Sequence, residues 1–303
     1  MKKPTGGKVN RTIRWSMSAV MILMSVSAGW AQGAERLPDP QPVGMVDEPC
    51  PPAITPSPAV RALLVDLFIE PRKLAAGDVD RLVKDPEFRI FEDASRRLSA
   101  GDWAGICRFS AANRAAPAAG QTPRVVFMGD SITENWLLAD PALFDHGVVN
   151  RGISGQTTAQ MLVRFRADVV SLHPQVVHIL AGTNDVAGNT GPTSARDFEN
   201  NIMSMVDIAR ANGIRVVLGS IPPTASFSWR PQLNPVPTIQ ALNAWLRSYA
   251  KRQRIAYIDY YSLLGGASGE LRNDLGNDGV HPNRVGYRLM RGLVEKQIGG
   301  AGK

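Results

Sequence analysis

Short apolar runs rich in β-branched residues alternate with amphipathic segments in the chain from residue 123 onward. The apolar runs predict strands at 124–128, 147–150, 175–180, 215–220 and 255–259. The amphipathic segments between and after them predict helices at 157–171, 194–212, 237–252 and 284–297. Strands that alternate with helices are typical of a parallel sheet covered by helices, so we expect an α/β domain over 123–303.

The chain before residue 123 has a different pattern. Residues 59–70 have a helical composition that ends at Pro71, and Asp85 followed by Pro86 marks the start of a second helix that ends near residue 101. Asp102 can cap a further short helix through residue 109. We therefore expect a small helical extension that packs on the α/β domain.

Two segments flank this helical extension. Residues 115–123 are rich in alanine and proline and are predicted to form a linker, while residues 32–58 are rich in proline and lack apolar periodicity. Together with the helices between them, they make a leader, extension and linker over 32–122.

The N-terminus has the pattern of an export signal. Five basic residues and no acidic residue fall within 1–14, and 15–28 is apolar apart from small serines. This stretch is shorter than the ~20 residues of a spanning helix, and Ala31 suits cleavage. We expect a signal peptide at 1–31 and a periplasmic or secreted protein with no stable membrane span after cleavage. An uncleaved membrane anchor is the alternative.

The charge of the chain does not indicate a nucleic-acid partner. The whole chain carries a net charge of +7, but removal of the basic leader leaves 29 Lys and Arg against 27 Asp and Glu, or +2. The basic residues of the mature part are scattered along it, whereas nucleic-acid binding requires a basic patch.

The cysteine and histidine content indicates no metal site. The two cysteines, Cys50 and Cys107, can form one disulfide across the N-terminal region in an oxidising compartment, with two free buried thiols as the alternative. A cysteine metal site would need more ligands nearby, and no two histidines have the spacing of metal ligands. We expect neither a metal nor another cofactor.

A Gly-Asp-Ser turn follows the first predicted strand. Ser131 thus lies at the carboxyl end of a strand and at the start of a helix, where backbone N–H groups are free and ligands bind in α/β sheets. A serine hydroxyl in this place is a candidate nucleophile, although Ser131 could also serve only as a helix N-cap.

A second polar turn, Asp278-Gly-Val-His281, precedes the last predicted helix. Serine is a weak nucleophile that needs a neighbouring base, and the base needs an orienting group. His281 and Asp278 are the candidates for these two roles. The alternative is that Asp278-Gly279 is only a turn.

Two further turns follow the second and third predicted strands. They place Gly155 and Asn184 at the same edge of the sheet as Ser131. The backbone N–H groups of Ser131 and Gly155 and the side-chain amide of Asn184 could stabilise the oxyanion of an ester hydrolysis. Each turn taken singly could equally just end its strand.

These four turns, in this order, resemble the four sequence blocks of the SGNH (GDSL-type) esterase and lipase superfamily, and the resemblance covers about 124–299. It implies a flavodoxin-like three-layer αβα sandwich. It also implies a serine ester hydrolase in which Ser131 is the nucleophile, Asp278 and His281 complete the triad, and Gly155 and Asn184 complete the oxyanion hole. The helical extension lies outside the resemblance.

Four residues are candidates for the substrate wall. A long loop at 221–237 follows the fourth strand at the active edge and carries Phe227, Trp229 and Arg230, and Trp136 lies just past the nucleophile. Packing of Trp229 or Trp136 into the core is the alternative.

We expect a hydrolase of small-molecule or carbohydrate esters that carry short acyl or acetyl groups. Lysophospholipids and thioesters also fit the resemblance. An acyltransferase and a non-catalytic envelope-binding module on the same fold are the rivals, and the presence of all three triad residues argues against the second.

Overall fold

The computed structural model describes residues 45–46, 49–75, 77–118 and 122–299. The predicted signal peptide at 1–31 and the first part of the leader lie outside these residues. No helix in the described part of the chain combines the length and apolar character that a bilayer crossing requires.

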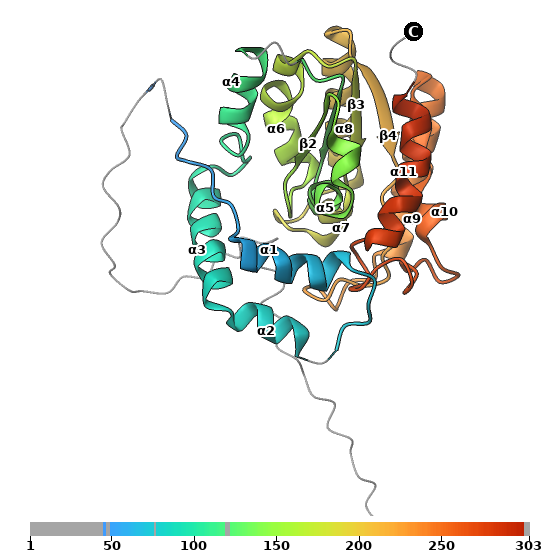
Figure 1. Cartoon of the computed structure of the whole chain (residues 1–303). Coiled ribbons are helices and arrows are strands. Elements are labelled where there is room, and N and C mark those ends of the chain that lie inside the picture. Colours follow the sequence, from blue (N-terminus) through green and yellow to red (C-terminus); the bar gives the residue numbers. More distant parts are fainter. Residues whose placement is uncertain (1–44, 47–48, 76, 119–121, 300–303) are drawn as a thin grey trace, which may run out of the picture.

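Five parallel strands form the central sheet in the order β2-β1-β3-β4-β5. Of these, β2, β3 and β4 are labelled in Figure 1. The five strands are β1 (Val125–Gly129), β2 (Val148–Gly152), β3 (Val176–Leu180), β4 (Arg215–Gly219) and β5 (Ala256–Ile258). This is the flavodoxin-like strand order, so the α/β expectation is confirmed. All five predicted strands are present, with ends that differ from the predicted ones by at most two residues.

Side chains alternate between the two faces of the sheet, so each face has its own core. Val126 and Met128 of β1 pack with α6 (Thr158–Asp168), α8 (Ala195–Ala211) and α9 (Val236–Gln253). Val125 and Phe127 pack with α5 (Ser131–Ala139), α10 (Tyr260–Leu264) and α11 (Arg284–Ile298) on the other face. Because successive side chains of a strand point to opposite faces, helices pack on both faces of the sheet and the domain has three layers.

Three short helices complete the domain. They are α7 (Thr183–Ala187) and the 3₁₀ helices η3 (Pro141–Phe144) and η4 (Val170–Leu172). The predicted helix at 157–171 is thus divided, because Val169 leaves the helical conformation between α6 and η4.

Helices also form the N-terminal extension. They are α1 (Pro58–Leu64), continued by the π-helical turn η2 (Val65–Ile69), then α2 (Asp78–Lys84), α3 (Pro86–Gly101) and α4 (Ser110–Ala118). Asp85 caps α3 by accepting a hydrogen bond from the N–H of Phe88 at 2.9 Å, as predicted. The sequence pattern did not predict α2.

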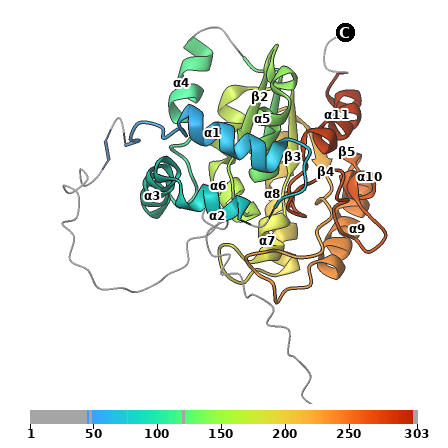
Figure 2. The ribbon, with the colours of Figure 1, turned by 60° about the horizontal axis from the view of Figure 1, so that its bottom comes forward.

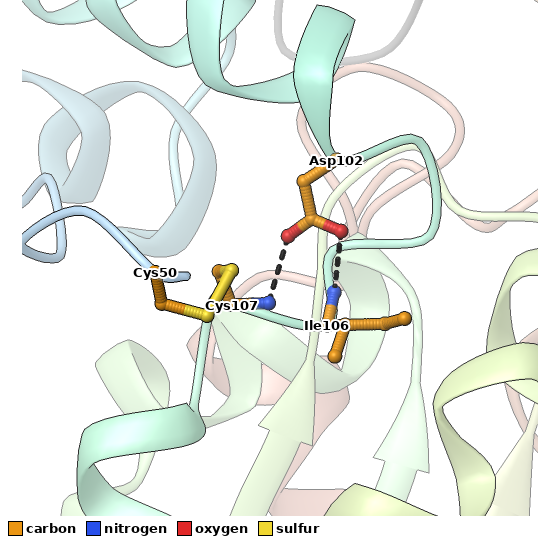
Figure 3. Close-up of a disulfide and its surroundings, with 4 residues drawn as sticks. All are labelled: Cys50, Asp102, Ile106 and Cys107. Carbon is orange, nitrogen blue, oxygen red and sulfur yellow. Dashed lines mark hydrogen bonds between the residues drawn. A yellow bond between two sulfur atoms is a disulfide. The ribbon is translucent and has the colours of Figure 1, made fainter. Parts of the chain in front are cut away.

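The prediction for residues 102–123 was wrong in two places. Asp102 starts no helix, because its carboxylate accepts the N–H groups of Ile106 and Cys107 at 2.9 and 2.7 Å and closes a loop (Figure 3). The helix comes later, as α4, and occupies the first residues of the predicted linker. The same loop carries the disulfide between Cys107 and Cys50.

The extension lies against the edge of the sheet where α5 begins (Figures 1 and 2). Asn277 donates to the carbonyl oxygens of Leu67 and Glu70 at 2.9 and 2.8 Å, and the Glu70 carboxylate pairs with Arg284. On its other side, Arg108 pairs with Glu134 of α5 at 3.0 Å. These contacts place α1 and η2 over the carboxyl ends of the strands.

Candidate active site

Ser131 is the first residue of α5 and directly follows the β1 turn. Asp130, not Ser131, is the N-cap: its carboxylate accepts the N–H of Ile132 at 2.9 Å. Ser131 is therefore free of capping and its hydroxyl can make other contacts. The serine lies at the positive end of the helix dipole, which favours negative charge beside it.

A continuous chain of hydrogen bonds joins Ser131 to Asp278. Ser131 Oγ lies 2.9 Å from His281 Nε2, and His281 Nδ1 lies 2.7 Å from Asp278 Oδ2. The other oxygen of Asp278 accepts the N–H groups of Val280 and His281 at 2.9 and 2.8 Å, which fixes the carboxylate. In the tautomer with a proton on Nδ1, Nε2 can accept the proton of the serine.

The carboxylate of Asp278 changes the pKa of His281. Burial lowers the pKa of His281, but the charge of Asp278 and its hydrogen bond outweigh burial, and Asp130 adds to them, so this pKa is raised. Burial likewise raises the pKa of Asp278, yet His281 and the two backbone N–H groups lower it overall. Asp278 thus stays ionised and stabilises a protonated His281.

The backbone N–H groups of Ser131 and Gly155 have no acceptor within the part of the protein that the structure describes. Gly155 has φ of 79°, in the left-handed region that favours glycine. Free N–H groups beside a serine hydroxyl are what an oxyanion hole requires.

Asn184 lies in α7, directly after β3, and is held by protein partners. Its amide nitrogen donates to the carbonyl oxygen of Gln156 at 3.0 Å and to Asp130 Oδ2 at 3.3 Å. Its amide oxygen accepts Asn189 Nδ2 at 2.7 Å. The amide is thus close to the site, but both of its hydrogens have acceptors in this structure.

Asp130 contributes more than a helix cap. It is fully buried, and burial raises its pKa to about 7, although the N–H of Ile132 and the charge of His281 oppose this. Its second oxygen accepts the Asn184 amide. Asp130 thus connects the serine turn to the asparagine turn.

Trp136 and Phe227 do not line the site, which corrects two predictions for the substrate wall. Trp136 points into the sheet core and packs on Phe127 and Tyr287 with ring centroids 5.6 and 5.5 Å apart. Phe227 is also fully buried and packs on Trp229 at 5.1 Å. The helical turn after Ser131 directs the Trp136 ring inward, and the sequence pattern alone did not show this direction.

Trp229 and Arg230 lie at cavities beside the site. Trp229 donates from its ring nitrogen to Asn189 Oδ1 at 3.2 Å and also lines the pocket at Ser131. Arg230 lines a second, larger cavity. The structure therefore brings two of the four predicted wall residues to the site.

The pocket at Ser131 and His281 is small and mostly apolar, with a volume of about 150 Å³. The helical extension supplies part of its wall through Leu64 and Phe68, and α5 supplies Leu137 and Leu138. The Phe68 ring meets the His281 ring edge-on, with centroids 6.1 Å apart. The extension is thus part of the site, which the sequence analysis left open.

Comparisons with known proteins indicate the family of the chain. A model of the GDSL-like lipase/acylhydrolase family matches residues 127–289. Esterase TesA of Pseudomonas aeruginosa is 31% identical over 180 residues, which cover 54% of this chain and 81% of the esterase. An uncharacterised lipoprotein of Bacillus subtilis, YqeF, is 35% identical over 74 residues, or 23% of this chain and 30% of that protein.

Solved structures give the same result. The crystal structure of a GDSL-like lipase from Bacteroides thetaiotaomicron aligns with a TM-score of 0.62 and 42% identity, over 65% of this chain and 98% of the lipase. A crystal structure from Bacteroides fragilis also aligns with a TM-score of 0.62 and 42% identity, over 65% of this chain and 97% of that protein. The chain therefore belongs to the GDSL-like lipase/acylhydrolase family and is a carboxylic ester hydrolase.

Proposed function

We propose that the protein is a serine esterase that works through an acyl-enzyme. His281 Nε2 takes the Ser131 proton while Oγ forms a bond to the ester carbonyl carbon. The tetrahedral oxyanion then collapses, the bond to the alcohol oxygen breaks, and His281 returns the proton to the leaving alcohol. In the second step His281 takes a proton from water, and the water oxygen bonds to the acyl carbonyl carbon. The bond to Ser131 Oγ then breaks, His281 returns the proton to Oγ, and the acid leaves. The observation that carries this proposal is the hydrogen-bond chain of 2.9 and 2.7 Å.

We assign stabilisation of the oxyanion to hydrogen bonds from the backbone N–H groups of Ser131 and Gly155 and from the side-chain amide of Asn184. Fixed donors of this kind each contribute about 3–4 kcal/mol to the transition state. The two N–H groups are unoccupied among the described residues, which supports their role directly. Asn184 must give up its bond to Asp130 or Gln156 to take part.

The acyl group in this proposal is short. An apolar cavity of ~150 Å³ holds a group about as large as benzene, and the pocket at Ser131 has this volume. Acetyl to hexanoyl esters fit such a space, including acetylated carbohydrates. The long acyl chains of lysophospholipids are larger than this space.

We also propose that the protein acts outside the cytoplasm, in the periplasm or beyond the cell. The basic and apolar pattern of 1–31 and the Cys50–Cys107 disulfide support this location, because disulfides persist in oxidising compartments. The named lipoprotein among its relatives is compatible with it.

A chain-length series tests the reaction and the acyl size together. We expect p-nitrophenyl acetate, butyrate and hexanoate to be hydrolysed, with kcat/KM falling steeply beyond hexanoate. The Ser131→Ala variant should hydrolyse none of them. A preference for p-nitrophenyl palmitate would refute the short acyl pocket, and undiminished turnover by Ser131→Ala would refute the serine mechanism.

A further inference from the structure

Glu134 lies on α5, one helical turn after Ser131, and takes no part in the proton transfers. Both of its carboxylate oxygens are bonded. Oε2 accepts the N–H of Ser154 at 2.8 Å and the Ser154 hydroxyl at 2.6 Å, and Oε1 accepts the Arg108 guanidinium at 3.0 Å. A single carboxylate thus joins the helix of the nucleophile to the turn after β2 and to the N-terminal extension.

The turn that Glu134 holds carries Gly155. Ser154 directly precedes Gly155, whose N–H we assign to the oxyanion. Hydrogen bonds to both the N–H and the hydroxyl of Ser154 fix the orientation of this residue, and with it the position of the next peptide, which carries the Gly155 N–H. On the other side, Asn189 Nδ2 donates to the carbonyl oxygen of Gly155 at 3.3 Å. The direction of the Gly155 N–H therefore depends on Glu134.

The same turn packs directly on the first turn of α5. A Cβ added at Gly152 would lie 2.2 Å from the backbone nitrogen of Glu134, so only glycine allows this approach. The N–H of Ile153 donates to the carbonyl oxygen of Gly129 at 3.1 Å. Backbone contact thus sets how close the turn comes to Ser131, and the Glu134 side chain adds the polar link across this contact.

Arg108 brings the helical extension into this arrangement. It follows Cys107 in the loop of Figure 3 and donates to the carbonyl oxygen of Ile54 at 3.0 Å as well as to Glu134. The Cys50–Cys107 disulfide fastens the same two segments of the extension. The guanidinium is therefore held on the extension side and binds one oxygen of Glu134, which leaves the other oxygen for the turn.

We propose that Glu134 is a positioning residue for the oxyanion hole and that Arg108 holds it in its active orientation. Glu134 acts through Ser154 on the Gly155 N–H. The inference rests on the proposed esterase function. It gives the extension, which lies outside the family match at 127–289, a part in turnover in addition to its part in the pocket wall.

Glu134→Ala and Glu134→Gln test the positioning role with p-nitrophenyl acetate and butyrate. Alanine removes the bonds to Ser154 and Arg108. Glutamine keeps one oxygen for Ser154 but cannot pair with Arg108, because its amide nitrogen is a donor. We expect kcat on both esters to fall about 10- to 100-fold for alanine and less for glutamine, with KM little changed, because a misplaced donor acts on the transition state.

Glu70→Gln is the matched control. The Glu70 carboxylate also joins the extension to the α/β domain through an arginine, Arg284, and the Glu70 and Glu134 side chains are 45% and 30% exposed. Glu70→Gln should lower the melting temperature about as much as Glu134→Gln and leave kcat unchanged. Equal losses of kcat in these two variants would overturn the positioning role. An unchanged kcat in Glu134→Ala, or a rise in KM alone, would also overturn it.

A double-mutant cycle tests the part of Arg108. If Arg108 acts through Glu134, Arg108→Ala lowers kcat in the wild type but has no further effect in Glu134→Ala. The same loss in both backgrounds would show that Arg108 does not act through Glu134 and would overturn this part of the inference.

The rate of fluorophosphonate labelling separates this inference from the proposed function. The phosphonyl oxygen occupies the same oxyanion hole, so Glu134→Ala should still be labelled on Ser131, but more slowly, by a factor close to its loss of kcat/KM. Labelling at the wild-type rate would overturn the positioning role and leave the esterase standing. A wild type that is inactive on both esters and unreactive toward the fluorophosphonate would overturn the proposed function instead.

Discussion

Single side chains set the acid–base behaviour of the site. In the proposed mechanism His281 acts as a base only while its imidazole is neutral. The charge of Asp278 raises the pKa of His281 above the ordinary 6.5 despite burial. Protonation therefore removes the base as the pH falls through this raised value. The plot of kcat/KM against pH should have an acidic limb centred above pH 6.5, because this parameter reports the free enzyme.

Replacement of Asp278 by asparagine tests the cause of this limb. Without the carboxylate, only Asp130 opposes the effect of burial on the pKa of His281, so the limb should move to lower pH. Activity should also fall by about 10⁴, the loss measured for the equivalent change in a serine protease, because an amide at this position favours the wrong tautomer of the histidine. A limb that stays above pH 6.5 in this variant would show that another group titrates.

Asn184→Ala separates the oxyanion role from a structural one. We expect kcat to fall by about 10² to 10³ with KM little changed, because a donor to the oxyanion acts in the transition state. The structure adds a stability cost, since this buried amide bonds Asp130, Gln156 and Asn189.

Asn189→Ala is the matched control for Asn184. It removes the bonds to the Asn184 amide oxygen and the Gly155 carbonyl oxygen and the bond from the Trp229 ring nitrogen, but no proposed donor to the oxyanion. It should lower the melting temperature to a similar extent while kcat falls far less. Equal losses of kcat in the two variants would assign Asn184 a purely structural role.

At the scale of elements, a buried ion pair fastens α6 to the end of β1 and to the extension. Arg164 is fully buried, pairs with Asp168 at 2.8 Å and donates to the carbonyl oxygen of Gly129 at 3.1 Å. Asp168 also accepts the side-chain amide of Asn113 of α4 at 2.6 Å. The carbonyl oxygen of Gly129, the first residue of the Gly-Asp-Ser turn, is thus held by α6, which lies on the face of the sheet opposite α5.

Asp168→Leu should lower the free energy of unfolding by about 3–5 kcal/mol, because it leaves the buried Arg164 without a counterion. The double variant Arg164→Met/Asp168→Leu should recover most of this loss, since neither charge is then buried alone. Urea unfolding of the two variants measures both values. If Asp168→Leu were as stable as the wild type, water or another group would have to compensate the charge of Arg164.

The order of the elements followed from the sequence, but their contacts did not. Short apolar runs rich in β-branched residues predicted all five strands, and four polar turns supplied Ser131, Gly155, Asn184 and His281 as candidates. The direction of Trp136 depends on how α5 packs on the sheet, and the partners of Asn184 come from three separate turns. Contacts between residues far apart in sequence, such as Arg108 with Glu134, leave no periodic signal.

At the scale of the whole molecule, the extension and the α/β domain form one site. Phe68 meets His281, and Leu64 and Phe91 complete the pocket at Ser131. The sequence divided the chain near residue 123 because the pattern of strands begins there. That division describes the secondary structure, whereas residues from both sides of it line the pocket at Ser131.

The disulfide stabilises this arrangement by joining residues 57 positions apart. Loss of such a link typically costs about 2–4 kcal/mol through the entropy of the unfolded chain. We expect the Cys50→Ser/Cys107→Ser variant to melt at a lower temperature, and dithiothreitol to lower the melting temperature of the wild type to the same value. The double variant should not respond to dithiothreitol, and a response would point to an effect unrelated to this bond.

Covalent labelling of Ser131 tests the central claim most directly. The wild-type protein is treated with a fluorophosphonate, digested, and mapped by mass spectrometry, with Ser131→Ala as the control and circular dichroism to verify that the control folds. We predict one adduct, on Ser131, formed in step with the loss of esterase activity and absent from the folded variant. An adduct on another residue, or full loss of activity without an adduct on Ser131, would contradict the assignment of Ser131 as the nucleophile.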